Sequence, residues 1–487
     1  MKKTLFLIFI LPLSISAQTD TTQKYDFFKK YSIKEQQEDF KILKTSLENI
    51  HPGLYWYLTK DEFEKEYNQV YTTINSENTA YQFLDKVDCL IAKIHCSHTM
   101  ANLSVKHVKF KTNNLLHFPF NVTIINSKLY IKHNYTEDSL FKTGTEILSI
   151  NGIKSSDLFQ KFIKRSYVDG FNKQAESSYL ATHFEVLTEY NFDIPNMYSM
   201  EVLSYNGKVI KKNVQALTWL VIQDGYSQNH PQEADETIKI IDSSKTAILT
   251  FNSFEDTSYV TFMEESFKTI KDKNIQNLII DIRKNAGGFD DFGQILYSYI
   301  AFSPFKYYNH LEMTIDSLNE NVLKYGNFDD TDGMKDFFNT NHIKKMSNGN
   351  YILDKKQHSI TANAPFLPQK NSFKGKVFIL TSNQSYSGAS EFSAIASFNK
   401  RATFIGQETG GGYSGNTSGF NYILKLPNTQ IRIAIPTIRY LSAIETSQNK
   451  GGVKPDYEIP PNINDLNTNT DHEMKFALDL IKKIAPH

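Results

Sequence analysis

Cysteine is nearly absent from this chain. Its 487 residues include only Cys89 and Cys96. Both are expected on one helix, where their spacing holds the two sulfur atoms too far apart along the helix face for an undistorted disulfide. The sequence therefore has no disulfide framework and no CxxC pair for zinc, and we expect two ordinary buried thiols.

The chain also lacks net charge. Lysine plus arginine and aspartate plus glutamate both total 53, so the formal charge is zero at pH 7. No global basic field draws the chain to nucleic acid or to acidic membranes, and nucleic acid is not an expected partner. The hydrophobic content of 40% supplies material for two or three domains, each with its own core.

Long hydrophobic runs are missing as well. The apolar run from Leu5 to about Leu13 is shorter than the roughly 20 residues that a membrane-spanning helix needs, and no later segment is apolar enough to span. Two lysines precede the run and small residues ending at Ala17 follow it, which is the layout of a cleaved secretory signal peptide. We expect residues 1–17 to be removed and the mature chain to be periplasmic or secreted.

Motifs for metals and nucleotides are not found. The sequence contains no HExxH, no Walker loop and no dinucleotide fingerprint, and no repeat period is visible. The run Gly410-Gly411-Gly412 could cradle a phosphate, but no lysine-serine pair follows it, so a mobile loop beside the substrate is the better interpretation. No metal or organic cofactor is therefore expected.

The periodicity divides the chain into three parts. Residues 18–110 carry three successive helical patterns, the third capped by Asn78 or Thr79, and we expect a helical domain there. Residues 111–215 change to a period of two, with a tight turn at Asn151-Gly152, and predict a compact β-rich module.

The third part, residues 216–487, is expected to be an α/β domain. Strand and helix patterns alternate after Ser244, which predicts a parallel sheet with right-handed crossovers. Residues 303–372 interrupt the alternation with polar, weakly periodic sequence, and we expect an insertion there. The strands are expected at 246–251, 277–283 and 376–382, with helices at about 291–300 and at 388–398.

Glycine-containing loops follow two of these buried strands, at the edge where open parallel sheets bind ligands. In the second loop, Ser387 stands immediately before a predicted helix. Its oxygen is exposed on a turn there, and the first N–H groups of the helix can stabilise an oxyanion. Ser387 is therefore the predicted nucleophile, and Ser385 and Ser390 are the neighbours that could be mistaken for it.

Four blocks of sequence resemble the C-terminal processing (tail-specific) serine peptidases, in the branch of the tricorn core protease. They are NLIIDIRKNAGG from Asn277, KVFILTSNQSYSGASEF from Lys376, RATFIGQETGGG from Arg401 and GGVKPDYEI from Gly451. The resemblance implies a crotonase/ClpP-like catalytic domain that hydrolyses polypeptides through an acyl-enzyme on Ser387. The stretch from Gly144 to Ile153 is similar to the PDZ-like module of these proteases, which captures peptide ends as an added strand.

The resemblance also bears on the base that activates the serine. Many tail-specific peptidases use a lysine a few residues beyond the third block's first glycine, but Gly412 occupies that position here. The tricorn-like branch uses a Ser-His pair from the N-terminal part, and Ser97-His98 resembles that pair. A histidine pKa lies near working pH, which suits a general base. His95, on the same turn, is the alternative.

Two further parts of the site follow from the same likeness. Glu445 is the expected acid that orients the histidine, because it lies at a tricorn-like distance after the nucleophile, and Asp456 is its rival. The expected oxyanion donors are the backbone N–H groups of Gly388 and of Gly287 or Gly288.

Two other functions fit parts of the sequence. The missing lysine also suits a protein of the same fold that binds peptides or apolar ligands without cleaving them. An esterase of the α/β-hydrolase type fits less well, because Ser387 lies in SYSGA and lacks a glycine two positions before it.

Overall fold

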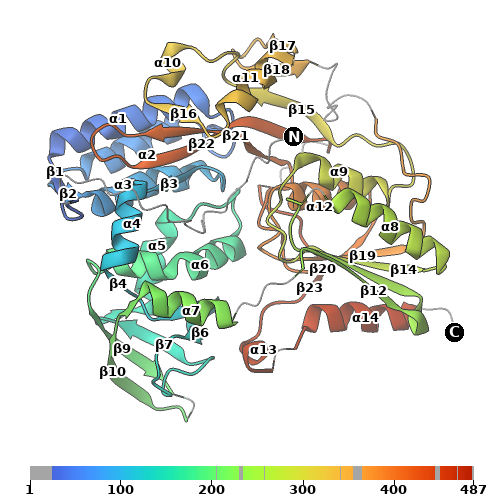
Figure 1. Ribbon diagram of the computed structural model, residues 1–487, viewed down its shortest axis with the longest axis horizontal. Coiled ribbons are helices and arrows are strands. Elements are labelled where there is room, and N and C mark those ends of the chain that lie inside the picture. The colour runs from blue at the N-terminus through green and yellow to red at the C-terminus, as the bar shows by residue number, and fades with distance from the viewer. Residues whose placement is uncertain are drawn as a thin grey trace.

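The computed structural model describes most of the chain after residue 24 (Figure 1). The expected signal peptide, residues 1–17, and the expected acid Glu445 lie outside the described residues. No helix in the described part is long and apolar enough to cross a membrane. The described residues are 25–484 except 205, 230–233, 257, 341, 355–364, 445–449 and 469.

The N-terminal part is helical, as predicted. Each of its three main helices begins with a capping box, in which a Ser or Thr side chain and a Glu or Gln side chain satisfy each other's backbone N–H groups. Thr79, rather than Asn78, caps the third helix. The helices are α1 (Ile33–Ile50), α2 (Lys60–Thr72) and α3 (Ala80–Ile91), and the short strands β1 (Lys30–Tyr31) and β2 (Asn78–Thr79) pair beside them.

The β-rich module has a six-stranded antiparallel sheet and its own hydrophobic core. The predicted tight turn is confirmed, since Asn151 and Gly152 have φ of 49° and 80° and join β7 to β8. The strands are β5 (Phe120–Ile125), β6 (Lys128–Asn134), β7 (Glu146–Ile150), β8 (Ile153–Lys154), β9 (Met197–Leu203) and β10 (Val209–Gln215). The helices are α4 (Val105–Asn114), α5 (Ser155–Phe162), α6 (Lys173–Asn191) and α7 (Trp219–Asn229).

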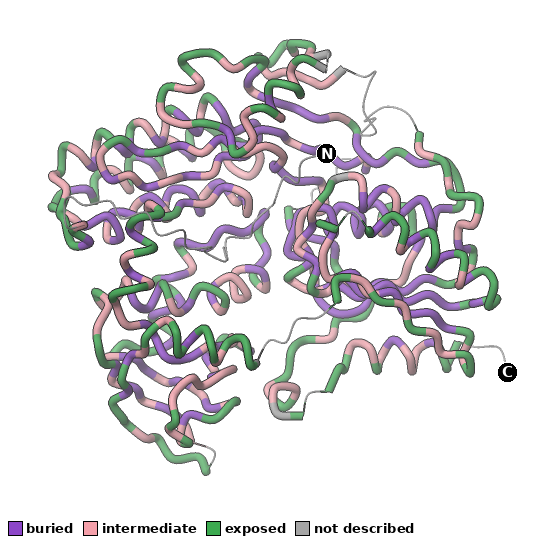
Figure 2. Tube along the Cα trace, viewed as in Figure 1, coloured by how far each residue is buried: buried purple, intermediate pink, exposed green. Residues whose placement is uncertain are grey.

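The predicted parallel sheet is confirmed. Its strands follow the order β12-β13-β14-β19-β20-β23, and every pair is parallel except β12 with β13. The inner strands are among the most buried segments of the chain (Figure 2). The strands are β12 (Glu236–Ile241), β13 (Thr246–Phe251), β14 (Asn277–Asp281), β19 (Lys376–Thr381), β20 (Thr403–Gly406) and β23 (Tyr457–Glu458).

Helices cover both faces of this sheet (Figure 1). The helices are α8 (Tyr259–Asp272), α9 (Asp290–Ser298), α12 (Gly388–Phe398) and α14 (His472–Ile484). Helices α8, α9 and α12 pack on one face of the sheet. Helix α14 covers the other face, where Ala477 and Ile481 meet Ile279 and Phe378. The boundaries of α12 are those that the sequence predicts.

A second sheet joins distant parts of the chain. The long hairpin β21–β22 lies at its centre, segment 303–372 adds strands on both sides, and β3 pairs with β22. Its strands are β3 (Met100–Asn102), β15 (Tyr308–Met313), β16 (Gly326–Phe328), β17 (His342–Lys345), β18 (Tyr351–Asp354), β21 (Gly415–Lys425) and β22 (Arg432–Ser442). Since β3 begins two residues after His98, this pairing carries the His98 turn to the catalytic domain.

The N-terminal helices are also fixed to that hairpin. The buried carboxylate of Asp39, on α1, accepts hydrogen bonds from the backbone N–H and the hydroxyl of Thr429, at 2.8 and 2.6 Å. It also accepts one from the N–H of Asn428, at 3.0 Å. Apolar side chains of α1 and of the parallel sheet belong to one continuous core. The helices and the catalytic domain therefore pack as one body.

Candidate active site

Ser387 occupies a strained turn between β19 and α12. Its φ of 49° and ψ of −127° are unusual for a residue with a Cβ, and its side chain makes no cap to the helix. Ser385 Oγ donates to the carbonyl of Ile282 at 2.8 Å, and Ser390 Oγ donates to that of Ser387 at 2.8 Å. In the described residues, the hydroxyl of Ser387 has no hydrogen-bond partner, and its side chain is partly exposed.

The loop after β14 lies directly against this serine. A Cβ on Gly287 would stand 2.6 Å from Cβ and 3.1 Å from Oγ of Ser387, and φ is 104° at this glycine. Only a residue without a side chain fits here. The N–H of Gly287 donates to Oδ1 of Asn285 at 2.8 Å. The N–H groups of Gly288 and Gly388 have no acceptor in the part of the chain that the structure describes.

The three consecutive glycines pack behind the same turn. A Cβ on Gly411 would stand 2.2 Å from Oγ of Ser390 and 3.1 Å from the nitrogen of Ser387. The N–H of Gly411 donates to the carbonyl of Ser385 at 3.1 Å. All three glycines are buried. The three glycines therefore form part of the wall around Ser387, which differs from the exposed loop that a mobile segment would form.

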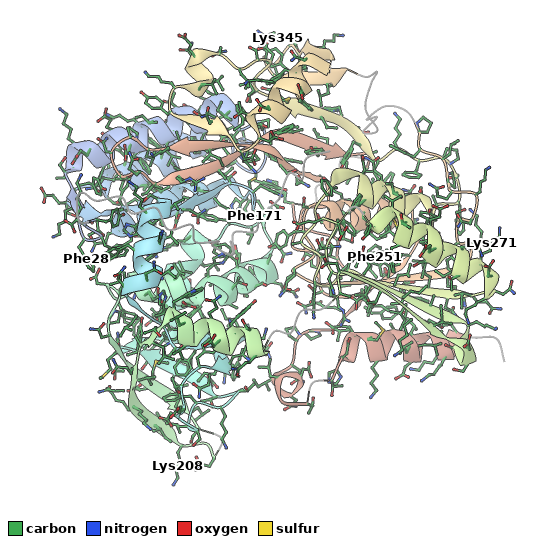
Figure 3. All side chains as sticks on the ribbon, viewed as in Figure 1. Phe28, Phe171, Lys208, Phe251, Lys271 and Lys345 are labelled. Carbon is green, nitrogen blue, oxygen red and sulfur yellow. The ribbon has the colours of Figure 1, made fainter. Side chains whose placement is uncertain are left out.

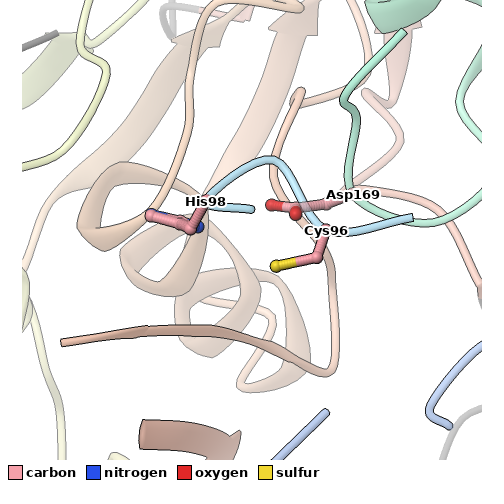
Figure 4. A group of neighbouring side chains, drawn as sticks. All are labelled: Cys96, His98 and Asp169. Carbon is pink, nitrogen blue, oxygen red and sulfur yellow. The ribbon is translucent and has the colours of Figure 1, made fainter. Parts of the chain in front are cut away.

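His98 lies beside a carboxylate that the sequence does not reveal (Figure 4). Asp169 accepts the N–H of Ser97 at 2.7 Å through Oδ1, and Oγ of Ser97 is 3.4 Å from Nδ1 of His98. One ligand atom each from Cys96, His98 and Asp169 lies within 4.8 Å of the other two. The predicted Ser97-His98 pair is thus joined by a buried acid from the β-rich part of the chain.

Asp169 is held in place by hydrogen bonds from the three residues that follow it. The N–H of Gly170 donates to the carbonyl of His95 at 3.1 Å, and that of Phe171 donates to Lys450 at 2.9 Å. Asn172 donates through Nδ2 to the carbonyl of Thr409 at 2.9 Å. Phe171 therefore lies at the middle of the molecule, where the N-terminal parts meet the catalytic domain (Figure 3).

The electrostatics of this group favour a neutral histidine. Burial lowers the pKa of His98, and the charge of Asp169 acts in the opposite direction. Burial raises the pKa of Asp169, against the opposing effects of His98 and of N–H groups that include that of Gly412. Burial and then the charge of Asp169 raise the pKa of Tyr386, the residue before Ser387. The carboxylate is thus close enough to act on the nucleophile's own turn.

The two other histidines near this group make different contacts. His51 lies between the N–H of Gly53, 3.1 Å from Nδ1, and Oγ1 of Thr99, 2.9 Å from Nε2, and burial lowers its pKa to about 3. His95 has a φ of 54° and packs its ring on Phe171, with 4.3 Å between the centroids. His98 is the histidine that lies within reach of Asp169.

The candidate residues are brought to one region but are not all in direct contact. Within the described residues, no hydrogen bond joins Oγ of Ser387 to His98. Catalytic hydrogen bonds are often long before substrate binds. Asp456, the rival acid, accepts the N–H of Phe404 at 2.8 Å through Oδ2 and so fixes the start of β20. Its carboxylate has a structural partner, whereas Oδ2 of Asp169 has no hydrogen bond of normal geometry in the described part.

Comparison with known proteins supports this description. Residues 245–459 match the family model described as Peptidase family S41. The chain is 15% identical to mature CPAF, with 93% of this chain and 99% of that chain covered and a TM-score of 0.62. For mature CPAF complexed with lactacystin the identity is 15%, the coverage 93% and 98%, and the TM-score 0.63. At identities this low, the similarity to these structures shows a shared fold alone.

No curated protein matches the chain. The family match includes β13, β14 and β19, both loops around Ser387 and the start of α12. The match therefore covers the parallel sheet except β12, together with the turn that carries Ser387. The part of the chain from residue 245 to residue 459 is therefore a domain of the peptidase S41 family, and the chain is a serine-type peptidase.

Proposed function

We propose that the protein is an exported endopeptidase that cleaves polypeptides through an acyl-enzyme on Ser387, with His98 as the general base. The observation that carries the proposal is the contrast among three neighbouring serines. The hydroxyls of Ser385 and Ser390 donate to backbone carbonyls. Ser387 lies on a strained turn, and its hydroxyl has no partner in the described residues. Strain of this kind typically accompanies function and costs about 1–3 kcal/mol.

The proposed reaction uses groups from three parts of the chain. Oγ of Ser387 attacks the peptide carbonyl while His98 takes its proton and later delivers it to the leaving amine. The N–H groups of Gly388 and Gly288 stabilise the oxyanion, because the N–H of Gly287 is already bound to Asn285. Water then hydrolyses the acyl-enzyme by the same proton transfers.

Asp169 is our candidate for the group that orients His98. Its carboxylate also accepts the N–H of Ser97, so one acid lies close to both members of the pair. A charge beside the ring favours the imidazolium that forms when the serine gives up its proton. Glu445, which the family resemblance implies, remains a second candidate for this role.

A binding protein on the same fold is the alternative. It is favoured by the missing hydrogen bond between Ser387 and His98 in the described residues, since such a pair would leave the serine unactivated. Reactivity of the serine separates the two functions.

Replacing Ser387 by alanine should remove cleavage of an unstructured peptide and leave the fold intact. A serine-directed fluorophosphonate should label the mature wild type once per chain, at Ser387, because an activated hydroxyl is the group that reacts. Ser390→Ala is the matched control, since it removes a hydroxyl one turn away that is bound to a carbonyl. An inert Ser387 in the wild type would favour the binding protein.

Replacing Asp169 by asparagine should change both the rate and its pH dependence. Asp169 raises the pKa of His98 against burial, so its removal should move the acid limb of kcat/KM to lower pH. The maximal rate should fall by about 10²–10⁴, because the imidazolium loses its counter-charge. Glu445→Gln is the comparison: if this variant shows the change and Asp169→Asn does not, Glu445 is the orienting acid.

Replacing Gly287 by alanine should lower kcat by about 10²–10³, similar to the loss of an oxyanion donor. The added Cβ would stand 2.6 Å from that of Ser387, so the turn and the adjacent Gly388 must move. Gly152→Ala is the control, because φ is 80° there and nothing lies within 4 Å of an added Cβ. Equal activities of the two variants in steady-state kinetics would contradict this role of Gly287.

Export is the remaining part of the proposal and depends on the N-terminal pattern. A charge in the apolar run, as in Ile8→Arg, should retain the chain in the cytoplasm when it is expressed in a Gram-negative bacterium. The control Thr21→Arg places the same charge after the expected cleavage site. Fractionation and N-terminal sequencing should find a periplasmic chain that begins after Ala17 for the wild type and for the control. An uncleaved cytoplasmic wild type would refute export.

A further inference from the structure

We propose that Cys96, His98 and Asp169 form a binding site for Zn²⁺, and that zinc bound there reversibly inhibits the peptidase. The inhibition rests on the proposed role of His98, whereas the binding of zinc does not. The metal acts as a regulator in this proposal and takes no part in catalysis.

The geometry brings three zinc ligands together. One atom each from Cys96, His98 and Asp169 lies within 4.8 Å of the other two. Zinc holds sulfur at about 2.3 Å and nitrogen or oxygen at about 2.0–2.2 Å, so tetrahedral ligand atoms lie about 3.3–3.8 Å apart. Side-chain rotations that shorten each separation by about 1.5 Å at most therefore complete the site.

The chemistry of the donors fits zinc better than other cations. A thiolate, an imidazole and a carboxylate are the ligand types that zinc uses, whereas magnesium and calcium prefer oxygen alone. Three protein ligands leave a fourth position for water. On binding, the thiol of Cys96 loses its proton to solvent, and the thiolate and carboxylate charges balance the two charges of the metal.

The surroundings also leave room for an ion. Cys96 and Asp169 are 6% and 3% exposed, and Oδ2 of Asp169 has no hydrogen bond of normal geometry in the described residues. Both carboxylate oxygens face the side where His98 and Cys96 lie (Figure 4). A small cavity beside them is lined by Trp56, Tyr57 and Thr417, among others. A buried carboxylate oxygen that lacks a well-formed hydrogen bond is costly, and a cation relieves that cost.

A second group of similar spacing differs because a lysine already lies among its ligand atoms. His117, Glu185 and Glu189 also offer three ligand atoms within 4.8 Å. There, however, Nζ of Lys111 is 2.5 Å from Glu189 and 3.3 Å from Nδ1 of His117, so an ammonium already supplies the positive charge. Lysine or arginine contributes no such contact to the Cys96 group in the described residues.

Inhibition follows from the lone pairs of the imidazole. A neutral histidine has one nitrogen that carries hydrogen and one that carries a lone pair. A metal on His98 takes that lone pair and leaves the proton on the other nitrogen. The ring then has no site for the proton of Ser387, and Asp169 is drawn to the metal at the same time. Zinc should therefore abolish general-base catalysis without touching the nucleophile.

Metal binding can be measured without any activity. Calorimetric titration of the Ser387→Ala protein with zinc should give one site per chain. Titration with Co²⁺ should give a thiolate-to-cobalt charge-transfer band. The variant Cys96→Ser should lose the band and bind zinc at least about tenfold more weakly, since even outer-sphere changes cost 10–100-fold. Cys89→Ser is the matched control, because Cys89 is the other free cysteine and is not in the group, and it should keep the band.

Inhibition is measured on the active protein. Zinc should inhibit peptide cleavage by the wild type and by Cys89→Ser, and a chelator should restore it. Cys96→Ser should need at least about tenfold more zinc than the wild type for half-inhibition of its own zinc-free rate. Equal zinc sensitivity of the two cysteine variants, or no cobalt band in the wild type, would overturn the inference. A cobalt band together with an inert Ser387 would sink only the proposed function.

Discussion

The pairing of β3 with β22 is the contact on which the proposed site depends. Met100 pairs with Ala434, so a strand that starts two residues after His98 is fixed to the catalytic domain. The same hairpin begins at Gly415, three residues after Gly412, whose N–H acts on Asp169. The hairpin β21–β22 therefore holds His98, the proposed base, close to the glycine loop that packs against Ser387. Asp39 clamps the turn of that hairpin to α1, which makes the helical domain part of the site's support.

The turn of Ser387, the proposed nucleophile, is shaped by close backbone packing. Gly287 and Gly411 each bring their backbone against the turn of Ser387, from two different loops, at distances that exclude a Cβ. A serine with φ of 49° persists only where its surroundings over-determine that conformation. The glycines allow this packing, and the hydroxyls of Ser385 and Ser390 reinforce it through backbone carbonyls. The strain holds the hydroxyl of Ser387 out of such local hydrogen bonds.

Local sequence signals were sufficient for several helices and strands. The range of α12, the strand β13 and the cap at Thr79 follow from periodicity and capping, which are short-range effects. Asp169 could not be found this way, because its partner Ser97 is 72 residues away and no motif surrounds it. Only tertiary packing creates that contact. The segment 303–372 looked polar for a related reason, since its strands flank the hairpin of the second sheet rather than enter the parallel sheet.

Burial imposes opposite demands on the two groups that matter most. It lowers the pKa of His98 and raises that of Asp169, so it opposes the charged form of each group. In the proposed acyl transfer a positive charge develops on the ring of His98, and the carboxylate of Asp169 then compensates it. A site built to receive one transient cation will also accept a permanent one, because the same desolvated carboxylate attracts both. Cys96 adds a soft thiolate ligand, which favours zinc and has no part in the transfer of a proton. The proposed zinc site and the proposed general base therefore share His98 and the carboxylate of Asp169.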